Sequence, residues 1–112
     1  MTNNIIDYRN EIKDLYFIPF RAHYIIPMNK RETYLHLKNH AKNIRFDLLC
    51  NSAEMFGFTC RGGRGSHRIF VREDVREMLN FQDVGGKAKP YQVKQLCKVI
   101  EDYSLLEGDD HV

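Results

Sequence analysis

Apolar residues recur with the period of an amphipathic helix in three segments of this 112-residue chain. The first segment spans 30–41, and Asn29 begins a capping-box pattern in front of it. The second spans 46–56, with Gly57 where a helix would end, and the third begins at Pro90, which suits a first helical turn. We therefore expect three helices. Their apolar positions are Tyr34, Leu37 and Ala41; Phe46, Leu49, Ala53 and Phe56; and Val93, Leu96, Cys97, Ile100 and Tyr103.

Between the second and third helices, short apolar runs alternate with glycine and charged residues, which is typical of strands and turns. We expect strands at 58–61, 66–72 and 78–82, a hairpin turn at 62–65, a charged connection at 73–77 and a flexible loop at 83–89. Short connections predict a three-stranded antiparallel sheet, with two helices on one face and the other face open. This α+β order, α-β-β-β-α after an N-terminal helical extension, is the layout of the double-stranded-RNA-binding fold class.

Residues 1–27 follow a different pattern. Apolar positions from Ile5 to Tyr16 suggest a short helix, and two proline-broken aromatic runs at 16–20 and 24–27 favour an irregular arm or an edge strand. A regular pattern starts at Met28, so we expect 1–27 to be an appended arm or the product of a misplaced translation start. The chain then divides into an arm with an extra helix at 1–42, a domain at 43–106 and an acidic tail at 107–112.

Charge is segregated along the chain, although the formal net charge is only +2. Ile44–Lys98 holds ten Lys/Arg and six Asp/Glu, whereas Val99–Val112 holds five acids and no Lys/Arg. A basic domain is compatible with a phosphate-bearing partner, and also with an ordinary solvated surface. The sequence shows no membrane-spanning run, no secretory signal pattern, and three widely spaced cysteines. These features favour a cytoplasmic protein with reduced thiols and no membrane association.

The stretch Arg61–Arg72 concentrates the candidate chemistry, since it holds four arginines, three glycines and no acid. His67 lies where the turn becomes strand, and an imidazole titrates near neutral pH. Such a group could take the proton from a ribose 2′-OH or protonate a leaving 5′-oxygen. Arg64, Arg68 and Lys87 could stabilise the charge on a pentacoordinate phosphate. Because one histidine cannot act as base and acid at once, this arrangement predicts a slow enzyme.

Alternation does not settle which face of the strand His67 occupies, because Ile69, Phe70 and Val71 are all apolar. We place Phe70 in the core and His67 on the exposed face. Ser66 then points away from His67, so we expect it to bond the hairpin or a phosphate rather than act as a nucleophile.

Gly85–Pro90 lacks the spacing of a nucleotide-binding P-loop. It is either a simple flexible loop or an anion site formed by backbone N–H groups with Lys87 and Lys89 at a helix N-terminus. Tyr91 either stacks on a base or covers the core.

His36 and His40 have the spacing of a metal-binding pair, but no third ligand is near in sequence, so we interpret them as surface residues and expect no metal. Cys50 and Cys97 lie on helical stripes and are interpreted as small core residues.

Two motifs resemble the HicA family of toxins. Gly65-Ser66-His67, inside Arg64–Phe70 and after the 46–56 helix, resembles the Gly-Ser-His signature of the family. Gly86–Gln95 begins with Gly-Lys-Ala-Lys, and it resembles a subgroup with this loop before the last helix. The likeness covers about residues 43 to 103. The chain departs from the family before residue 43, and it has Pro90-Tyr91 where many members have Gly-Thr.

The resemblance implies a metal-independent endoribonuclease toxin that cleaves mRNA, needs no cofactor and uses His67 as its catalytic histidine. The glycine and serine of the family correspond to Gly65 and Ser66. The implied partner is a HicB antitoxin, and we expect the free chain to be a monomer. Two other interpretations stay open: a non-catalytic RNA-binding module, and a domain that binds an acidic protein. The expected RNA contacts are Arg64, Gly65, Ser66, Arg68, Lys87 and Lys89.

Overall fold

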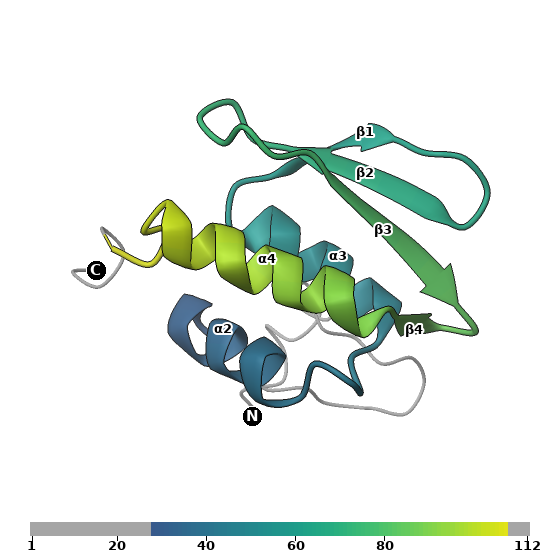
Figure 1. Cartoon of the computed structure of the whole chain (residues 1–112), viewed down its shortest axis with the longest axis horizontal. Coiled ribbons are helices and arrows are strands. Elements are labelled where there is room, and N and C mark those ends of the chain that lie inside the picture. The colour runs from purple at the N-terminus through teal and green to yellow at the C-terminus, as the bar shows by residue number, and fades with distance from the viewer. Residues whose placement is uncertain (1–27, 108–112) are drawn as a thin grey trace, which may run out of the picture.

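The computed structural model describes residues 28–107 and shows an α+β fold with one four-stranded antiparallel sheet (Figure 1). In chain order the elements are α2 (Lys30–Asn39), α3 (Phe46–Met55), β1 (Thr59–Gly62), β2 (His67–Val71), β3 (Leu79–Val84), β4 (Lys87–Ala88) and α4 (Pro90–Asp102). Each strand pairs with the next one along the chain. The expected helix and strand at 1–27 lie outside the described residues.

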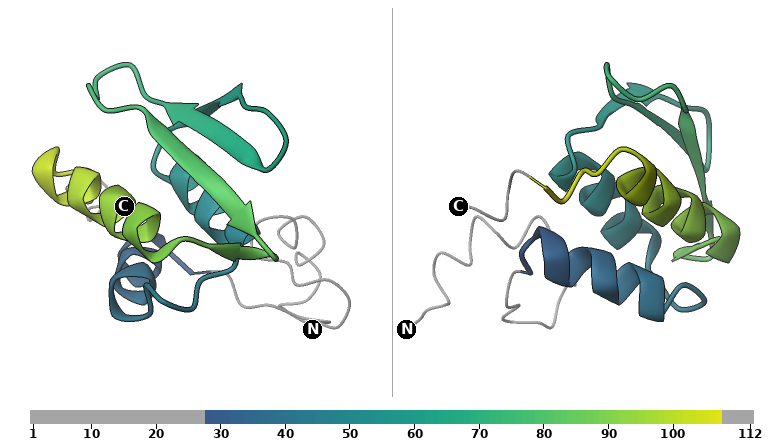
Figure 2. Two further views of the ribbon diagram at one scale, coloured as in Figure 1. Left: turned by 45° about the vertical axis from the view of Figure 1, so that its right-hand side comes forward. Right: turned by 60° about the vertical axis from the view of Figure 1, so that its left-hand side comes forward.

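Three layers are visible in the structure. α3 and α4 lie against one face of the sheet, and α2 packs on α4 and α3 from the side away from the sheet (Figure 2). Among residues 28–107, no helix covers the opposite face of the sheet, as the sequence predicted. No helix in this part of the chain is both long and apolar enough to cross a membrane.

α2 forms where the sequence predicted it, and it ends at Asn39, two residues before the predicted end. The capping box is present: the Asn29 side chain accepts from the Glu32 N–H at 2.8 Å, and Glu32 Oε1 accepts from the Asn29 N–H at 3.1 Å. Leu37 of this helix is fully buried in the common core, together with Ala41 and Ile44 after the helix. α2 and the residues directly after it are therefore packed into the same core as the sheet.

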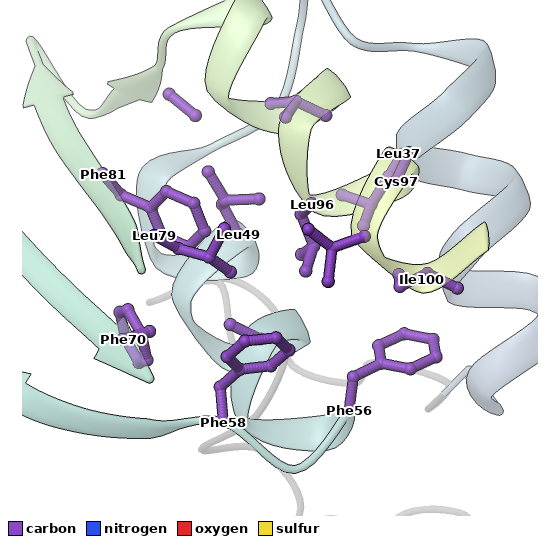
Figure 3. Packing of buried hydrophobic residues seen from close by; sticks show 14 of the residues in the cluster. Leu37, Leu49, Phe56, Phe58, Phe70, Leu79, Phe81, Leu96, Cys97 and Ile100 are labelled. Carbon is purple, nitrogen blue, oxygen red and sulfur yellow. The ribbon is translucent and has the colours of Figure 1, made fainter. Parts of the chain in front are cut away.

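α3 and α4 supply most of the helical side of the core (Figure 3). Gly57 follows α3 with a φ of +92°, as expected for a glycine that ends a helix. Pro90 occupies the first turn of α4. The buried side chains from the helices are Leu49, Ala53, Val93, Leu96, Cys97, Val99 and Ile100, and they meet Phe58, Phe70, Leu79 and Phe81 from the sheet and its approach.

The sheet corrects the predicted number of strands from three to four. β3 extends to Val84, and the expected flexible loop at 83–89 is instead a tight hairpin in which Asp83 pairs with Ala88 and Val84 with Lys87. Gly85 and Gly86 have φ values of +61° and +88°, the left-handed values that a two-residue hairpin turn requires. A two-residue strand is too short to show a period-two pattern, so alternation could not reveal β4.

Alternate residues of β2 and β3 point to opposite faces of the sheet. Leu79 and Phe81 are fully buried against the helices, whereas Asn80 between them is exposed. Phe70 is 2% exposed and its ring centroid lies 5.5 Å from that of Phe81, which confirms its predicted place in the core. His67, three positions earlier on β2, therefore lies on the outer face.

Candidate active site

The turn between β1 and β2 places Gly63 directly against the start of β2. All three glycines of the turn have positive φ: +116° at Gly62, +141° at Gly63 and +58° at Gly65. A Cβ added at Gly63 would lie 2.1 Å from the carbonyl oxygen of His67, whereas one added at Gly62 or Gly65 would meet nothing within 4 Å. Only glycine therefore permits the approach of this turn to the backbone of His67. The sequence showed three glycines without distinguishing this one.

His67 is half-buried on the outer face of the sheet. The antiparallel register sets His67 opposite Gln82 and Ile69 opposite Asn80, so these four residues share one face. The ring nitrogen Nδ1 of His67 lies 3.1 Å from Oδ1 of Asn80. With Nδ1 hydrogen-bonded, Nε2 is the nitrogen left for a substrate. Among residues 28–107, no carboxylate forms an ion pair with this ring.

Arg68 lies on the other face of β2 from His67, because it pairs with the fully buried Phe81. Its Nη1 donates to the carbonyl oxygens of Gly65 and His67, at 3.0 and 2.8 Å. The guanidinium group therefore stabilises the turn and remains exposed at its edge. The structure brings Arg68 near the turn backbone rather than beside the imidazole.

The four arginines between Arg61 and Arg72 have different roles in the structure. Arg72 joins β2 to the end of α3, because its Nη1 donates to the carbonyl oxygen of Phe56 at 2.6 Å and its Nε to Asp74 at 2.8 Å. Within residues 28–107, Arg61 and Arg64 form no ion pair or side-chain hydrogen bond, and both are exposed. These two arginines are the cationic groups of the turn most available to a ligand.

Ser66 contributes a backbone contact to the site. Its carbonyl oxygen accepts from the Asp83 N–H at 2.8 Å, which extends the β2–β3 ladder beyond His67. The residue is exposed, so its hydroxyl stays accessible beside the turn. Because Asp83 also pairs with Ala88 of β4, the turn and β4 lie at the same end of the sheet.

Lys87 and Lys89 flank Ala88 at this end. Lys87 pairs with Val84, which places both on the outer face with His67, and its Nζ donates to Oδ1 of Asn43 at 2.6 Å. Lys89 is the N-cap residue of α4 without a side-chain capping bond. The Gly86 N–H donates to Oδ1 of Asp83 at 2.6 Å, so this amide is already used within the hairpin.

A surface hollow on the outer side of β1 and β2 lies away from the imidazole, and His67 does not line it. Its lining includes Thr59 and Val71, which pair at the end of the hairpin opposite the turn, and also Arg61 and Arg72. Glu73 and Asp74 line it as well, so the hollow carries both signs of charge.

Cys50 and Cys97 lie on α3 and α4, and His36 and His40 lie on α2 and directly after it. Burial raises the pKa of the Cys50 thiol to about 12 and that of the Cys97 thiol to about 11, so both stay protonated at neutral pH. Cys97 is buried and Cys50 packs against the core, as predicted. His40 is the C-cap residue of α2; the His36 and His40 ring centroids are 4.8 Å apart, and burial lowers the pKa of His36. Residues 28–107 contain no group of three His, Cys, Asp or Glu side chains placed to hold a metal.

Asn80 is the member of this site that sequence reasoning missed. It lies 13 positions after His67, and only the register of the β2–β3 pair brings the two side chains together. A polar residue between the apolar Leu79 and Phe81 was a signal for an outward-facing position.

No protein-family model matches the chain, and comparisons with curated proteins and with solved structures find no match either. The functional interpretation therefore depends on the geometry around His67.

Proposed function

We propose that this chain is a HicA-type toxin, an endoribonuclease that cleaves mRNA without a metal ion and uses His67 as its catalytic base. The observation that carries this proposal is the placement of His67 on the outer sheet face. Its Nδ1 is held by Asn80, and its Nε2 has no hydrogen-bond partner among residues 28–107. Arg64 in the adjoining turn is exposed, and so is Arg61 of β1. We also infer that the segment from α3 to α4 has the double-stranded-RNA-binding topology, to which α2 and β4 are additions.

The chemistry that fits this geometry is transesterification within RNA. Nε2 of His67 takes the proton of a ribose 2′-OH, the 2′-oxygen bonds to phosphorus, and the bond from phosphorus to the 5′-oxygen breaks. The products are a 2′,3′-cyclic phosphate and a 5′-hydroxyl, whose proton comes from water or from the imidazolium. Arg64 and Lys87 supply positive charge for the phosphate in the transition state. General base catalysis of this kind contributes roughly 10²–10⁴-fold to the rate.

The test is cleavage of a labelled RNA in the presence of EDTA. We expect the wild type to cleave it, a strand with 2′-deoxyribose at the scissile position to resist, and His67→Ala to abolish cleavage while the thermal transition is retained. His40→Ala is the matched control, because His40 is an exposed histidine at the C-terminal end of α2. Full cleavage by a folded His67→Ala protein would contradict the mechanism.

A second candidate function is RNA binding without catalysis. Arg61 and Arg64 favour it, because both are exposed and neither forms an ion pair within residues 28–107. In that case His67→Ala would leave RNA affinity unchanged and the wild type would not cleave. Neutralising either arginine should weaken binding and lower the slope of log K against log salt by about one. Cleavage assays and salt titrations on the same variants separate the two functions.

The proposed partner is a HicB-like antitoxin that covers the outer face, and the proposed setting is the cytoplasm, with the free toxin a monomer. Val84 of this face is 50% exposed, and Met78, directly before β3, is 60% exposed, so both offer apolar surface to a partner. Co-expression with the product of the neighbouring gene should suppress growth arrest and RNA cleavage. Growth arrest that persists in the presence of a co-purifying partner would argue against this pairing.

A further inference from the structure

The His67 ring has one side-chain partner within the described part of the chain, and that partner is Asn80 of β3. The Cα partner of Asn80 is Ile69, two residues after His67, so Asn80 lies diagonally across the β2–β3 pair on the same face. Asn80 is exposed, and residues 28–107 show no other hydrogen bond for its side chain. Because Asn80 is exposed, its side chain does not contribute to the core. Its contact with the imidazole is the role that the structure shows for it.

The contact decides which ring nitrogen carries the proton. A neutral imidazole has one N–H donor and one acceptor nitrogen, and a base needs the acceptor nitrogen directed at the substrate. Free imidazole side chains in water favour the form with the proton on Nε2, which would leave the outward nitrogen without a lone pair. An amide oxygen 3.1 Å from Nδ1 selects the opposite form, because it accepts a hydrogen bond only from Nδ1–H.

We infer that Asn80 is a positioning residue for the proposed reaction: its Oδ1 holds His67 in the Nδ1–H form and directs the Nε2 lone pair to the ribose 2′-OH. The catalytic part of this inference rests on the proposed function, whereas the tautomer itself is a property of the folded protein. Asn80 also fixes the rotation of the ring about its side-chain bonds, since the acceptor on β3 is held by the strand register.

The first measurement is the tautomer of His67, read from the ring ¹⁵N and ¹H shifts of the free protein. We expect the wild type to show Nδ1–H, and Asn80→Leu, which keeps the size and removes the acceptor, to populate the Nε2–H form. Gln82→Ala is the matched control, because Gln82 lies directly opposite His67 on the same face and its side chain forms no hydrogen bond to the ring. This control should keep the wild-type tautomer.

The second measurement is cleavage kinetics. Loss of the correct tautomer should lower kcat of Asn80→Leu roughly 10- to 100-fold and leave KM within about twofold, since the substrate contacts are unchanged. Asn80→Asp should restore both the Nδ1–H form and most of the rate, because a carboxylate can only accept from Nδ1. This variant also tests the orientation of the amide: an asparagine that donates its NH₂ to Nδ1 would not be replaceable by aspartate.

The outcomes separate this inference from the proposed function. If the wild type does not cleave RNA, the proposed function fails, and the tautomer of wild type and Asn80→Leu still decides whether Asn80 holds the ring. If the wild type cleaves and Asn80→Leu keeps the wild-type tautomer, the inference is overturned, whatever its rate. An altered tautomer with an unchanged rate would also overturn it, because the selected form would then have no catalytic consequence.

Discussion

The two faces of the β2–β3 pair are built from alternate residues of the same strands, and they differ in burial and in polarity. On the inner face, the rings of Phe70 and Phe81 pack 5.5 Å apart beneath the helices (Figure 3). On the outer face, His67 and Asn80 form a polar contact at 3.1 Å that remains accessible to solvent. The inner face stabilises the fold and the outer face is available for chemistry. Substitutions at neighbouring positions should therefore separate stability from function.

The largest expected effect is on the inner face. Phe70→Ala should lower the free energy of unfolding by about 3–5 kcal/mol, because it removes a fully packed aromatic side chain and leaves a cavity. Urea denaturation would measure this loss, and Ile69→Thr, one position away on the outer face, is the control with a cost below about 1 kcal/mol. Equal losses in the two variants would show that the outer face is also part of the core.

At Gly63 a substitution should affect both stability and function. The turn that contains Gly63 adjoins the proposed catalytic residue His67, and only glycine fits against the backbone there. Gly63→Ala should destabilise the protein by about 2–3 kcal/mol and displace His67, because the new Cβ collides with the carbonyl oxygen of that residue. Gly65→Ala, in open space with a φ of +58°, should cost only about 1 kcal/mol. Chemical denaturation and the His67 ring shifts would measure both effects. A mild effect at Gly63 equal to that at Gly65 would contradict the close approach.

The helical side of the core was predictable from sequence because helical stripes follow from spacing and hydrophobicity. Phe70 was placed in the core correctly, although alternation did not distinguish it from Ile69 and Val71. β4 was not predicted, because two residues carry no period. The Gly85-Gly86 pair before it is nevertheless typical of a two-residue hairpin turn, although a flexible loop was predicted there. The rule that consecutive strands pair then extends the sheet by one strand.

The site was predictable only in part. His67 stood out as the one histidine beside a basic glycine turn, and the structure places it on the open face as expected. Its partner Asn80 could not be found, because the contact depends on the register of two strands rather than on spacing. The number of charged residues also could not show which arginines bind the backbone. Arg68 and Arg72 donate hydrogen bonds to backbone carbonyl oxygens, whereas the Arg64 side chain forms no such bond within residues 28–107. Whether Arg64, Gly65, Ser66, Arg68, Lys87 and Lys89 contact RNA stays a prediction.

Within residues 28–107, one buried polar side chain is expected to lower the stability of the fold. Thr33 on α2 is fully buried, and its Oγ1 has no hydrogen-bond partner within residues 28–107. Thr33→Val keeps the shape and removes the unsatisfied hydroxyl, so it should raise the free energy of unfolding by up to about 1 kcal/mol. Thermal and urea denaturation would measure the gain, with Ser52→Ala as a contrast, because the Ser52 hydroxyl is buried but donates to the Leu48 carbonyl at 2.7 Å. Destabilisation by Thr33→Val would show that the hydroxyl is satisfied.

The smallest expected effect is a pH-dependent one at the junction of α2 and α4. Glu101 accepts from Lys38 Nζ at 2.8 Å and from the Tyr34 hydroxyl at 2.5 Å, and these hydrogen bonds hold the pKa of its carboxyl below the ordinary value of 4.5. Because the folded state lowers this pKa, the stabilisation is fully present above that ordinary value. It is lost as the pH falls through the lower folded value.

The melting temperature of Glu101→Gln should therefore lie slightly below that of the wild type at neutral pH, and the two should converge as the medium becomes more acidic than pH 4.5. Glu54→Gln is the control substitution, because Glu54 is an exposed glutamate of α3 that forms no ion pair within residues 28–107. A gap that persists at the acid end would mean that Glu101 stabilises α2 through packing of its side chain rather than through its charge. In that case the side chain of Glu101 would act together with the packing of Leu37 and its apolar neighbours.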